Sequence, residues 1–313
     1  MIPIWADGHY NVDTNDTGHK NRTGIKMKNR IAVKLWLFIF FILNTIAVEA
    51  ATVRVNPTKI RLIIPPGESR SGLIEVDNPS DEALVIKAYL QDWLYTSAQD
   101  GTKDFFPAAS TPTSCAKWIS LSFSDFVIPA FSKQNINYTV KVPKDAEGGH
   151  YAVLFFESLL GQPELKETPQ LGVLIRVGAL FYIEPQGTVT RSAEINNLSL
   201  KKTSDKGLEI TLDFKNSGNA DIISKSTFHI IDSQGMVAAR GDFNDVYTFP
   251  VNSSKLTAYW KEIIPKGKYS LVITLDMGKV LEEAKLGSGP VITKESEIEI
   301  GNEGEPVKVG ILK

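Results

Sequence analysis

The chain has 313 residues, of which 42% are hydrophobic and 22% charged, enough apolar material for two ordinary domains. The formal net charge is -2 and the basic residues are scattered, which excludes the basic face that nucleic-acid binding requires. A single cysteine, Cys115, excludes a disulfide within the chain, and the sequence lacks the Cys and His ligands of a zinc site. Cys115 is interpreted as a small apolar filler, with a free thiol or an intermolecular bridge as the alternative.

Residues 27–50 carry the pattern of a secretory signal peptide. Three basic residues precede an apolar run over 35–43: Lys28, Arg30 and Lys34. Val48-Glu49-Ala50 then provides a small-x-small cleavage site. The apolar run is shorter than the roughly 20 residues of a membrane span, which favours a cleaved signal peptide. The alternative is an uncleaved signal anchor, and we expect membrane association only in that case.

Residues 1–26 are polar and show no hydrophobic period. Because a signal peptide begins at the first residue, we interpret 1–26 as a mis-called extension in front of a start at Met27, with a disordered tail as the alternative. Export predicts a periplasmic or extracellular location, and the lack of disulfides favours a bacterial envelope.

The remainder of the chain has β signals throughout, with Val, Ile, Phe and Tyr runs between Gly, Pro, Asn and Ser clusters. In the first half, strands are predicted at 52–55, 59–64, 71–77, 83–93, 117–123, 135–142, 150–158 and 171–183. The long polar segment 94–116 is expected to be a loop or a weakly paired excursion. Pro185-Gln186-Gly187 ends the pattern and is taken as the domain boundary.

The second half repeats the theme. Its predicted strands are 192–201, 207–215, 222–232, 236–242, 245–249, 254–261, 267–276 and 291–300, with one or two helical turns at 279–286. The fold class is therefore all-β, with two immunoglobulin-like β-sandwich domains in tandem after the signal peptide. Domain bounds of 51–185 and 188–300 are predicted, followed by a flexible tail over 301–313.

Parts of the first half resemble the N-terminal domain of periplasmic pilus-assembly chaperones, the PapD-like immunoglobulin fold. The resemblance is carried by PTKIRLII (57–64), a Pro-Pro-Gly turn, GLIEVDNPSDEALVIKAYLQDW (72–93) and Leu180-Phe181-Tyr182 before Pro185. GGHYAVLFFES (148–158) is also similar to wider PapD-like envelope proteins, including surface-binding modules. The second half resembles adhesion-type immunoglobulin-like modules.

The resemblance implies that two basic residues anchor the terminal carboxylate of a partner subunit. The first would be Lys59 or Arg61. Ala179 stands where the family has the second, and Arg176, three residues away, is predicted to point to the other sheet face. Ile183-Glu184 stand where the family has a further basic residue.

Two groups of residues are candidates for partner binding. Lys59 and Arg61 share one strand face, which is either solvated or an anion site. Alternate apolar residues on the last strand of the first half would fill a partner's groove if that strand is donated, and would be core otherwise. They are Leu171, Val173, Ile175 and Val177.

Enzymatic residues are not recognised in this sequence. His150 and His229 fall in different predicted domains without a nucleophile frame, and no cofactor, phosphate or dinucleotide motif is present. Trp93, Trp118, Tyr89, Trp260 and Tyr269 are predicted core residues, with glycan binding as the alternative.

The sequence therefore predicts an exported, non-enzymatic, chaperone-like protein that binds another envelope protein, such as a β-rich surface subunit, along an edge strand. The alternative is a structural or adhesive protein that binds cell-wall or surface polymers.

Overall fold

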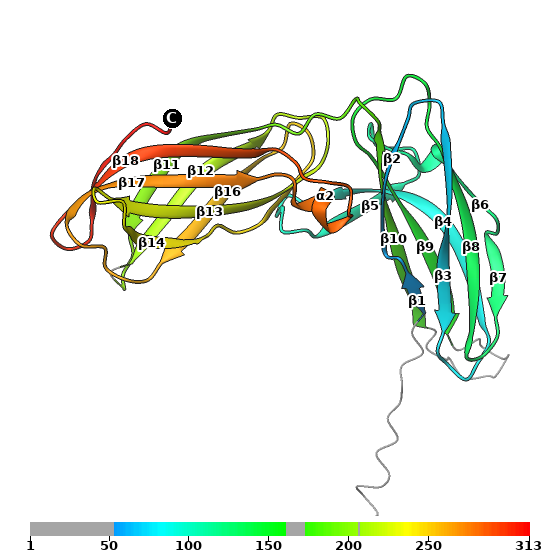
Figure 1. Cartoon of the computed structure of the whole chain (residues 1–313). Coiled ribbons are helices and arrows are strands. Elements are labelled where there is room, and N and C mark those ends of the chain that lie inside the picture. The colour runs from blue at the N-terminus through cyan, green and yellow to red at the C-terminus, as the bar shows by residue number, and fades with distance from the viewer. Residues whose placement is uncertain (1–52, 161–172, 206) are drawn as a thin grey trace, which may run out of the picture. The chain divides into compact units, whose positions relative to one another are not determined.

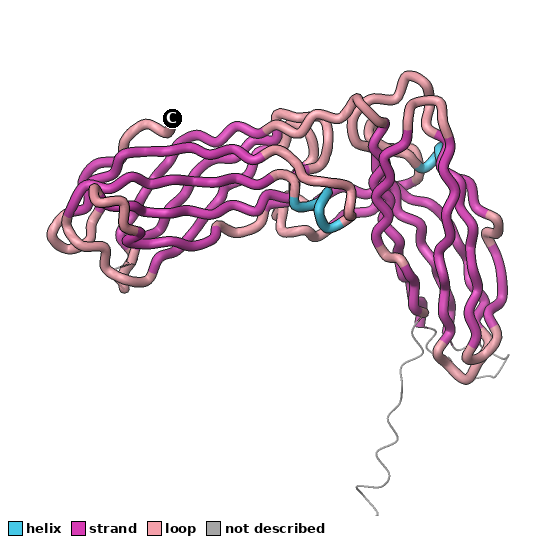
Figure 2. Tube along the Cα trace, viewed as in Figure 1, coloured by secondary structure: helices cyan, strands magenta, loops and turns pink. Residues whose placement is uncertain are grey.

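The computed structural model describes residues 53–160, 173–205 and 207–313, which belong to one compact unit, Ala51–Lys313. The predicted leader, the extension over 1–26 and Leu171 lie outside the described residues. Almost all of the regular structure is β-strand (Figures 1 and 2), and this confirms the predicted fold class of two β-sandwiches.

The first sandwich is built from ten strands and one short 3-10 helix, Ala116–Trp118. The strands are β1 (Arg54–Asn56), β2 (Lys59–Ile64), β3 (Ser69–Asn78), β4 (Leu84–Tyr95), β5 (Lys103–Pro107), β6 (Ile119–Leu121), β7 (Asp125–Ile128), β8 (Ser132–Lys141), β9 (His150–Leu160) and β10 (Val173–Pro185). One sheet has the order β1-β3-β8-β6. The other has the order β2-β10-β9-β4-β5, with β7 also paired to β4.

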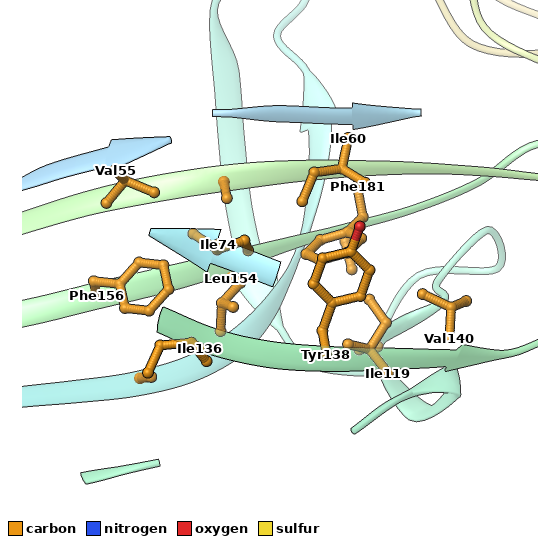
Figure 3. Packing of buried hydrophobic residues seen from close by; sticks show 14 of the residues in the cluster. Val55, Ile60, Ile74, Ile119, Ile136, Tyr138, Val140, Leu154, Phe156 and Phe181 are labelled. Carbon is orange, nitrogen blue, oxygen red and sulfur yellow. The ribbon is translucent and has the colours of Figure 1, made fainter. Parts of the chain in front are cut away.

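The core of the first sandwich lies between these two sheets (Figure 3). Ile74 and Ile136 from one sheet meet Leu154, Phe156 and Phe181 from the other, and all five are fully buried. The strands alternate between core-facing and outward-facing positions, because successive side chains of a strand point to opposite faces. On β10 the odd-numbered residues face the core, and on β4 and β9 the even-numbered residues do.

The second sandwich contains the remaining strands and a short helix. These are β11 (Ala193–Lys202), β12 (Leu208–Asn216), β13 (Ile222–Asp232), β14 (Val237–Asp242), β15 (Val246–Thr248), β16 (Ser253–Trp260), β17 (Gly267–Asp276), α2 (Lys279–Glu283), β18 (Val291–Ile300) and β19 (Pro306–Val309). The sheets have the orders β11-β12-β16 and β14-β13-β17-β18-β19, with β15 paired to β13. Phe214 and Phe228 lie at the centre of their core.

Most predicted strands are found within two residues of their predicted positions, but three strands were missed, and the strand predicted at 117–123 begins as the short 3-10 helix Ala116–Trp118. The segment 94–116, predicted as a loop or a weakly paired excursion, contains a strand that was not placed, β5, which pairs with β4. Strand β7 was not predicted. The segment 301–313, predicted as a flexible tail, contains β19, and Val309 and Leu312 pack on the second core. Each missed strand is four or five residues long, too short for a period-two pattern to be distinctive.

Asp92 holds the segment after β5 in place. Its fully buried carboxylate accepts hydrogen bonds from the backbone N–H groups of Ala109, Ser110 and Thr111, at 3.2, 2.8 and 2.8 Å. The hydroxyls of Thr111 and Ser114 donate two more, at 3.0 and 2.5 Å. A polar segment that carries no apolar pattern is thus ordered by one carboxylate.

The described residues contain no helix that is both long and apolar enough to cross a membrane.

Replacing Asp92 is expected to destabilise the first sandwich. Asp92→Ala leaves five donors without their acceptor, so we expect the free energy of unfolding to fall by about 2–4 kcal/mol, measured by urea denaturation. The control is Asp81→Ala, because Asp81 is exposed, and a change within about 0.5 kcal/mol is expected there. A similarly small change for Asp92→Ala would contradict this role.

Candidate partner-binding site

Lys59 and Arg61 lie on the same outward face of β2, as their spacing predicts. Strand β2 runs parallel to β10, with Lys59 opposite Leu180 and Arg61 opposite Tyr182. The Lys59 Nζ lies 5.3 Å from the centre of the Tyr182 ring, and the Arg61 guanidinium carbon lies 4.3 Å from it. Their environments nevertheless differ, because Lys59 is exposed and Arg61 is buried.

Arg61 belongs to a buried network of two cations and two carboxylates. Its guanidinium donates to Asp221 at 3.0 and 2.6 Å and also bonds to Glu184. Arg191 donates to the same Glu184 carboxylate at 3.0 and 2.8 Å. Arg61 and Glu184 come from the first sandwich, and Asp221 directly precedes β13 of the second. The charge of Arg61 is therefore neutralised internally, and of the two basic residues on β2 only Lys59 presents its charge to the surface.

An aromatic cluster surrounds this network. Trp93, Tyr151 and Tyr182 come from β4, β9 and β10, and Phe249 follows β15. The ring centres of Trp93 and Phe249 are 5.3 Å apart, and those of Tyr151 and Phe249 are 4.4 Å apart. The Tyr151 hydroxyl also accepts a 2.6 Å hydrogen bond from the Asp221 backbone N–H. Trp93 is thus buried, as predicted, but in a cluster to which both sandwiches contribute residues.

Lys103 on β5 is a second basic residue near Lys59, and sequence reasoning missed it. Its Nζ lies 5.7 Å from the Trp93 ring centre and 5.6 Å from that of Tyr95. Partial burial, together with the charge of Lys59, lowers the pKa of Lys103. Partial burial and the charge of Arg61 lower the pKa of Lys59. A bound anion would therefore stabilise the charged form of both lysines. The Glu283 carboxylate of α2 is 4.0 Å from Lys59 Nζ.

Ala179 and Arg176 lie on opposite faces of β10, as predicted. Ala179 is fully buried in the core of the first sandwich. Arg176 is exposed, and its guanidinium carbon lies 4.2 Å from the centre of the Phe155 ring. A basic side chain at position 179 would therefore enter the apolar core.

The first half of β10 has a strand partner on one side only. Val173–Ala179 pair with β9, whereas β2 begins its pairing at Leu180. Strand β1 passes close to β10 but is hydrogen-bonded to β3 of the other sheet. Among the described strands, none pairs with the side of Val173–Ala179 that faces away from β9. We call this side the open edge.

Exposure along the open edge falls toward Ala179. Val173 is 51% exposed, Ile175 and Val177 are partly buried, and Ala179 is fully buried. These three partly exposed residues alternate on the core-facing side of the strand, as predicted. Their role in partner binding remains a prediction.

Several functional residues have weak sequence signals. Glu184 is a charged residue inside an apolar strand, and Asp221 stands between Ala220 and Ile222 in an apolar run. A carboxylate in such a position indicates a buried cation that neutralises it. Nothing in the sequence indicates that both bond to Arg61, which lies 123 and 160 positions away. His150 contacts Trp118 with ring centres 4.2 Å apart and ring planes tilted by 46°. No group of three or more metal-ligating side chains gathers within the described part of the chain.

Comparison with known proteins finds similar solved structures. No family model matches the sequence, and no curated protein matches it. The chain is similar to the class 5 fimbriae chaperone CfaA, with 16% identity, a TM-score of 0.44, and 78% of this chain and 98% of that chain covered.

Two further structures are similar at lower identity. A chain of the Salmonella enterica SafA pilin–SafB chaperone complex has 12% identity, a TM-score of 0.39, and coverages of 79% and 97%. The E. coli chaperone DraB has 12% identity, a TM-score of 0.37, and coverages of 78% and 97%. At these identities and TM-scores the likeness specifies no function, so the chain's own residues must.

Removing one carboxylate of the buried network is expected to destabilise the protein and change its acid response. Burial alone raises the pKa of Asp221, but the charge and hydrogen bonds of Arg61 outweigh it, and the pKa is lowered. The resulting stability is present above the ordinary carboxyl pKa and is lost as the pH falls through the lowered value. We expect Asp221→Asn to cost about 2–4 kcal/mol near neutral pH.

The measurement is urea denaturation between about pH 2 and pH 7. Below about pH 4 the difference between wild type and Asp221→Asn should shrink, because Asp221 of the unfolded wild-type chain takes up a proton that the folded carboxylate binds only at lower pH. Glu262→Gln is the control, since Glu262 is exposed. A difference that stays constant across this range contradicts the assigned charge state.

Proposed function

We propose that this protein is a chaperone-like assembly factor that holds a β-rich envelope or pilus subunit by strand addition at the open edge of β10. The observation that carries the proposal is the open edge itself. A strand with unpaired backbone groups and exposed apolar side chains is a template for another strand. In β-augmentation, main-chain hydrogen bonds provide affinity and alternate side chains provide specificity.

The apolar residues at the open edge fit this role. Val173, Ile175 and Val177 alternate along β10 and are incompletely covered by the first sandwich. A partner strand that pairs there would bring its own sheet against these side chains and bury them. The stabilisation would be about 25 cal/mol for each Å² of apolar surface removed from water. An exposed strand of this kind is an aggregation hazard when it has no partner, which favours a function in which it has one.

Lys59 and Lys103 supply a place for a carboxylate near the end of the same strand. Lys59 lies opposite Leu180, directly beyond the open edge. In this proposal Lys103, beside the Trp93 ring, is the second cation, in place of the basic residue that Ala179 replaces. A carboxylate between two partly desolvated ammonium groups forms charge-assisted hydrogen bonds, which are stronger than neutral ones. We propose that the terminal carboxylate of the bound subunit occupies this position.

The resemblance of residues 57–64 and 72–93 to pilus-assembly chaperones supports the same function. It also supports a periplasmic location, in agreement with the leader predicted over 27–50. The role that we assign to the protein requires no bond making or breaking, and so no catalytic residues. Nothing in the described part of the chain favours binding of a cell-wall polymer over binding of a protein.

The open edge is tested by introducing a charge into it. Val173→Asp leaves a carboxylate unpaired in the proposed interface, so we expect at least a tenfold loss of the subunit that co-purifies with the tagged protein. The measurement is quantitative mass spectrometry of complexes isolated from the cell envelope. Leu73→Asp is a matched control, because Leu73 is 52% exposed on β3 of the other sheet.

The outcome separates the two functional classes. Recovery of a stoichiometric, β-rich protein with wild type and Leu73→Asp, but not with Val173→Asp, supports strand addition. Retention of all three on peptidoglycan or glycan, without such a protein, supports polymer binding instead. Equal recovery of the subunit by Val173→Asp rejects the open edge as the binding site.

The carboxylate position is tested separately. Lys59→Gln and Lys103→Gln each remove one charged donor, and each should weaken capture of that subunit roughly tenfold. Lys117→Gln is the control, because Lys117 is exposed but lies on the short helix before β6 rather than on β2 or β5. Unchanged capture by both variants, with capture by Val173→Asp lost, would leave strand addition standing without a carboxylate anchor.

A further inference from the structure

Four charged residues form a row across the outward face of the sheet that contains β10. Asp125 of β7 lies opposite Lys87 of β4, Lys87 lies opposite Glu157 of β9, and Glu157 lies opposite Arg176 of β10. The charges alternate along the row as negative, positive, negative and positive. Cross-strand neighbours of opposite charge stabilise a sheet, whereas like charges directly opposite each other destabilise it.

Arg176 is the last residue of this row, and it lies in the middle of the open edge. The two inner members of the row, Lys87 and Glu157, each have an oppositely charged neighbour on both adjacent strands. Arg176 has such a neighbour only on the β9 side, since β2 begins its pairing four residues later, at Leu180. The next strand of the sheet would place a side chain directly opposite Arg176.

The charge of Arg176 is available to such a side chain. The Glu157 carboxylate accepts a 2.6 Å hydrogen bond from the Tyr89 hydroxyl. Arg176 also interacts with the Tyr89 hydroxyl, a neutral group that leaves its charge unmatched. Among the described residues Arg176 forms no ion pair, and its exposed guanidinium rests against the Phe155 ring. Arginine stacked on aromatic rings is a common feature of interface centres, because little side-chain entropy remains to be lost on binding.

The neighbouring positions define the remainder of the complementary strand. On the outward face, Leu174 is 59% exposed on one side of Arg176. Gly178 lies on the other side, where a Cβ atom would stand 2.9 Å from side-chain atoms of Phe155 and Val153, so the chain itself carries no side chain there. On the opposite face, Ile175 and Val177 flank position 176. A complementary strand is therefore apolar at the positions facing Ile175 and Val177.

We infer that the open edge selects a partner strand with an acidic residue opposite Arg176 and apolar residues on either side of it. This inference rests on the proposed function and adds the chemistry by which partner strands are told apart. An Asp or Glu there extends the alternating row by one member, and a Lys or Arg meets a like charge.

The test uses two fluorescent peptides that differ in one residue. Each is a seven-residue alternating strand with blocked ends, the length of the open edge, with Glu at the central position in one peptide and Lys in the other. A central position lies opposite Arg176 whether the peptide binds parallel or antiparallel to β10. We expect fluorescence anisotropy to show that the Glu peptide binds wild type roughly three- to tenfold more tightly than the Lys peptide.

Variants of the chain assign the preference to Arg176. Arg176→Glu should reverse the preference, and Arg176→Gln should abolish it while both peptides still bind. Lys117→Glu changes the net charge by the same amount as Arg176→Glu at an exposed position on the short helix before β6, and it should preserve the wild-type preference.

Failure of the inference is distinguishable from failure of the proposed function. Equal binding of the two peptides, lost for both in Val173→Asp, overturns the role of Arg176 and leaves strand addition in place. Binding that is insensitive to Val173→Asp overturns the open edge and the inference with it. Binding of neither peptide overturns both proposals.

Discussion

The structure depends on the buried pairing of Arg61 with Asp221 and Glu184. Burying an ion is costly unless its charge is matched, and here two guanidinium groups face two carboxylates. Asp221 belongs to the second sandwich, and the other three residues lie on β2, on β10 and in the segment before β11. The network therefore fixes β2 and the end of β10 against Asp221, and the Trp93–Phe249 cluster packs around it.

This constraint explains why one half of β10 is covered and the other half is open. Strand β2 is held beside Leu180–Pro185 by its parallel pairing and by Arg61, while β1 pairs with β3 in the opposite sheet. The chain thus leaves the edge of β10 between these two strands, at Val173–Ala179. The same arrangement places Lys59 where the open edge ends, and the pairing of β5 with β4 brings Lys103 to the aromatic rings beneath it.

The strands with long alternating patterns could be predicted from sequence, because burial of one sheet face requires a period of two. Strands β12, β13, β17 and β18 match their predicted ranges to within one residue. Strands β5, β7 and β19 could not be predicted, because their pairing is decided by neighbours rather than by their own composition. Among the candidate site residues, the shared face of Lys59 and Arg61 followed from parity, but the burial of Arg61 depended on Asp221, 160 residues away.

The sequence by itself determined the all-β class, the strands that alternate, and the opposite faces of Ala179 and Arg176, since each of these follows from local periodicity. The tertiary structure alone decided which charges meet. It paired Arg61 with Asp221, brought Lys103 near Lys59, aligned Arg176 with Glu157, Lys87 and Asp125, and left Val173–Ala179 with one strand neighbour. The physical reason is that strand order and register are set by contacts between distant segments, and no local pattern encodes them.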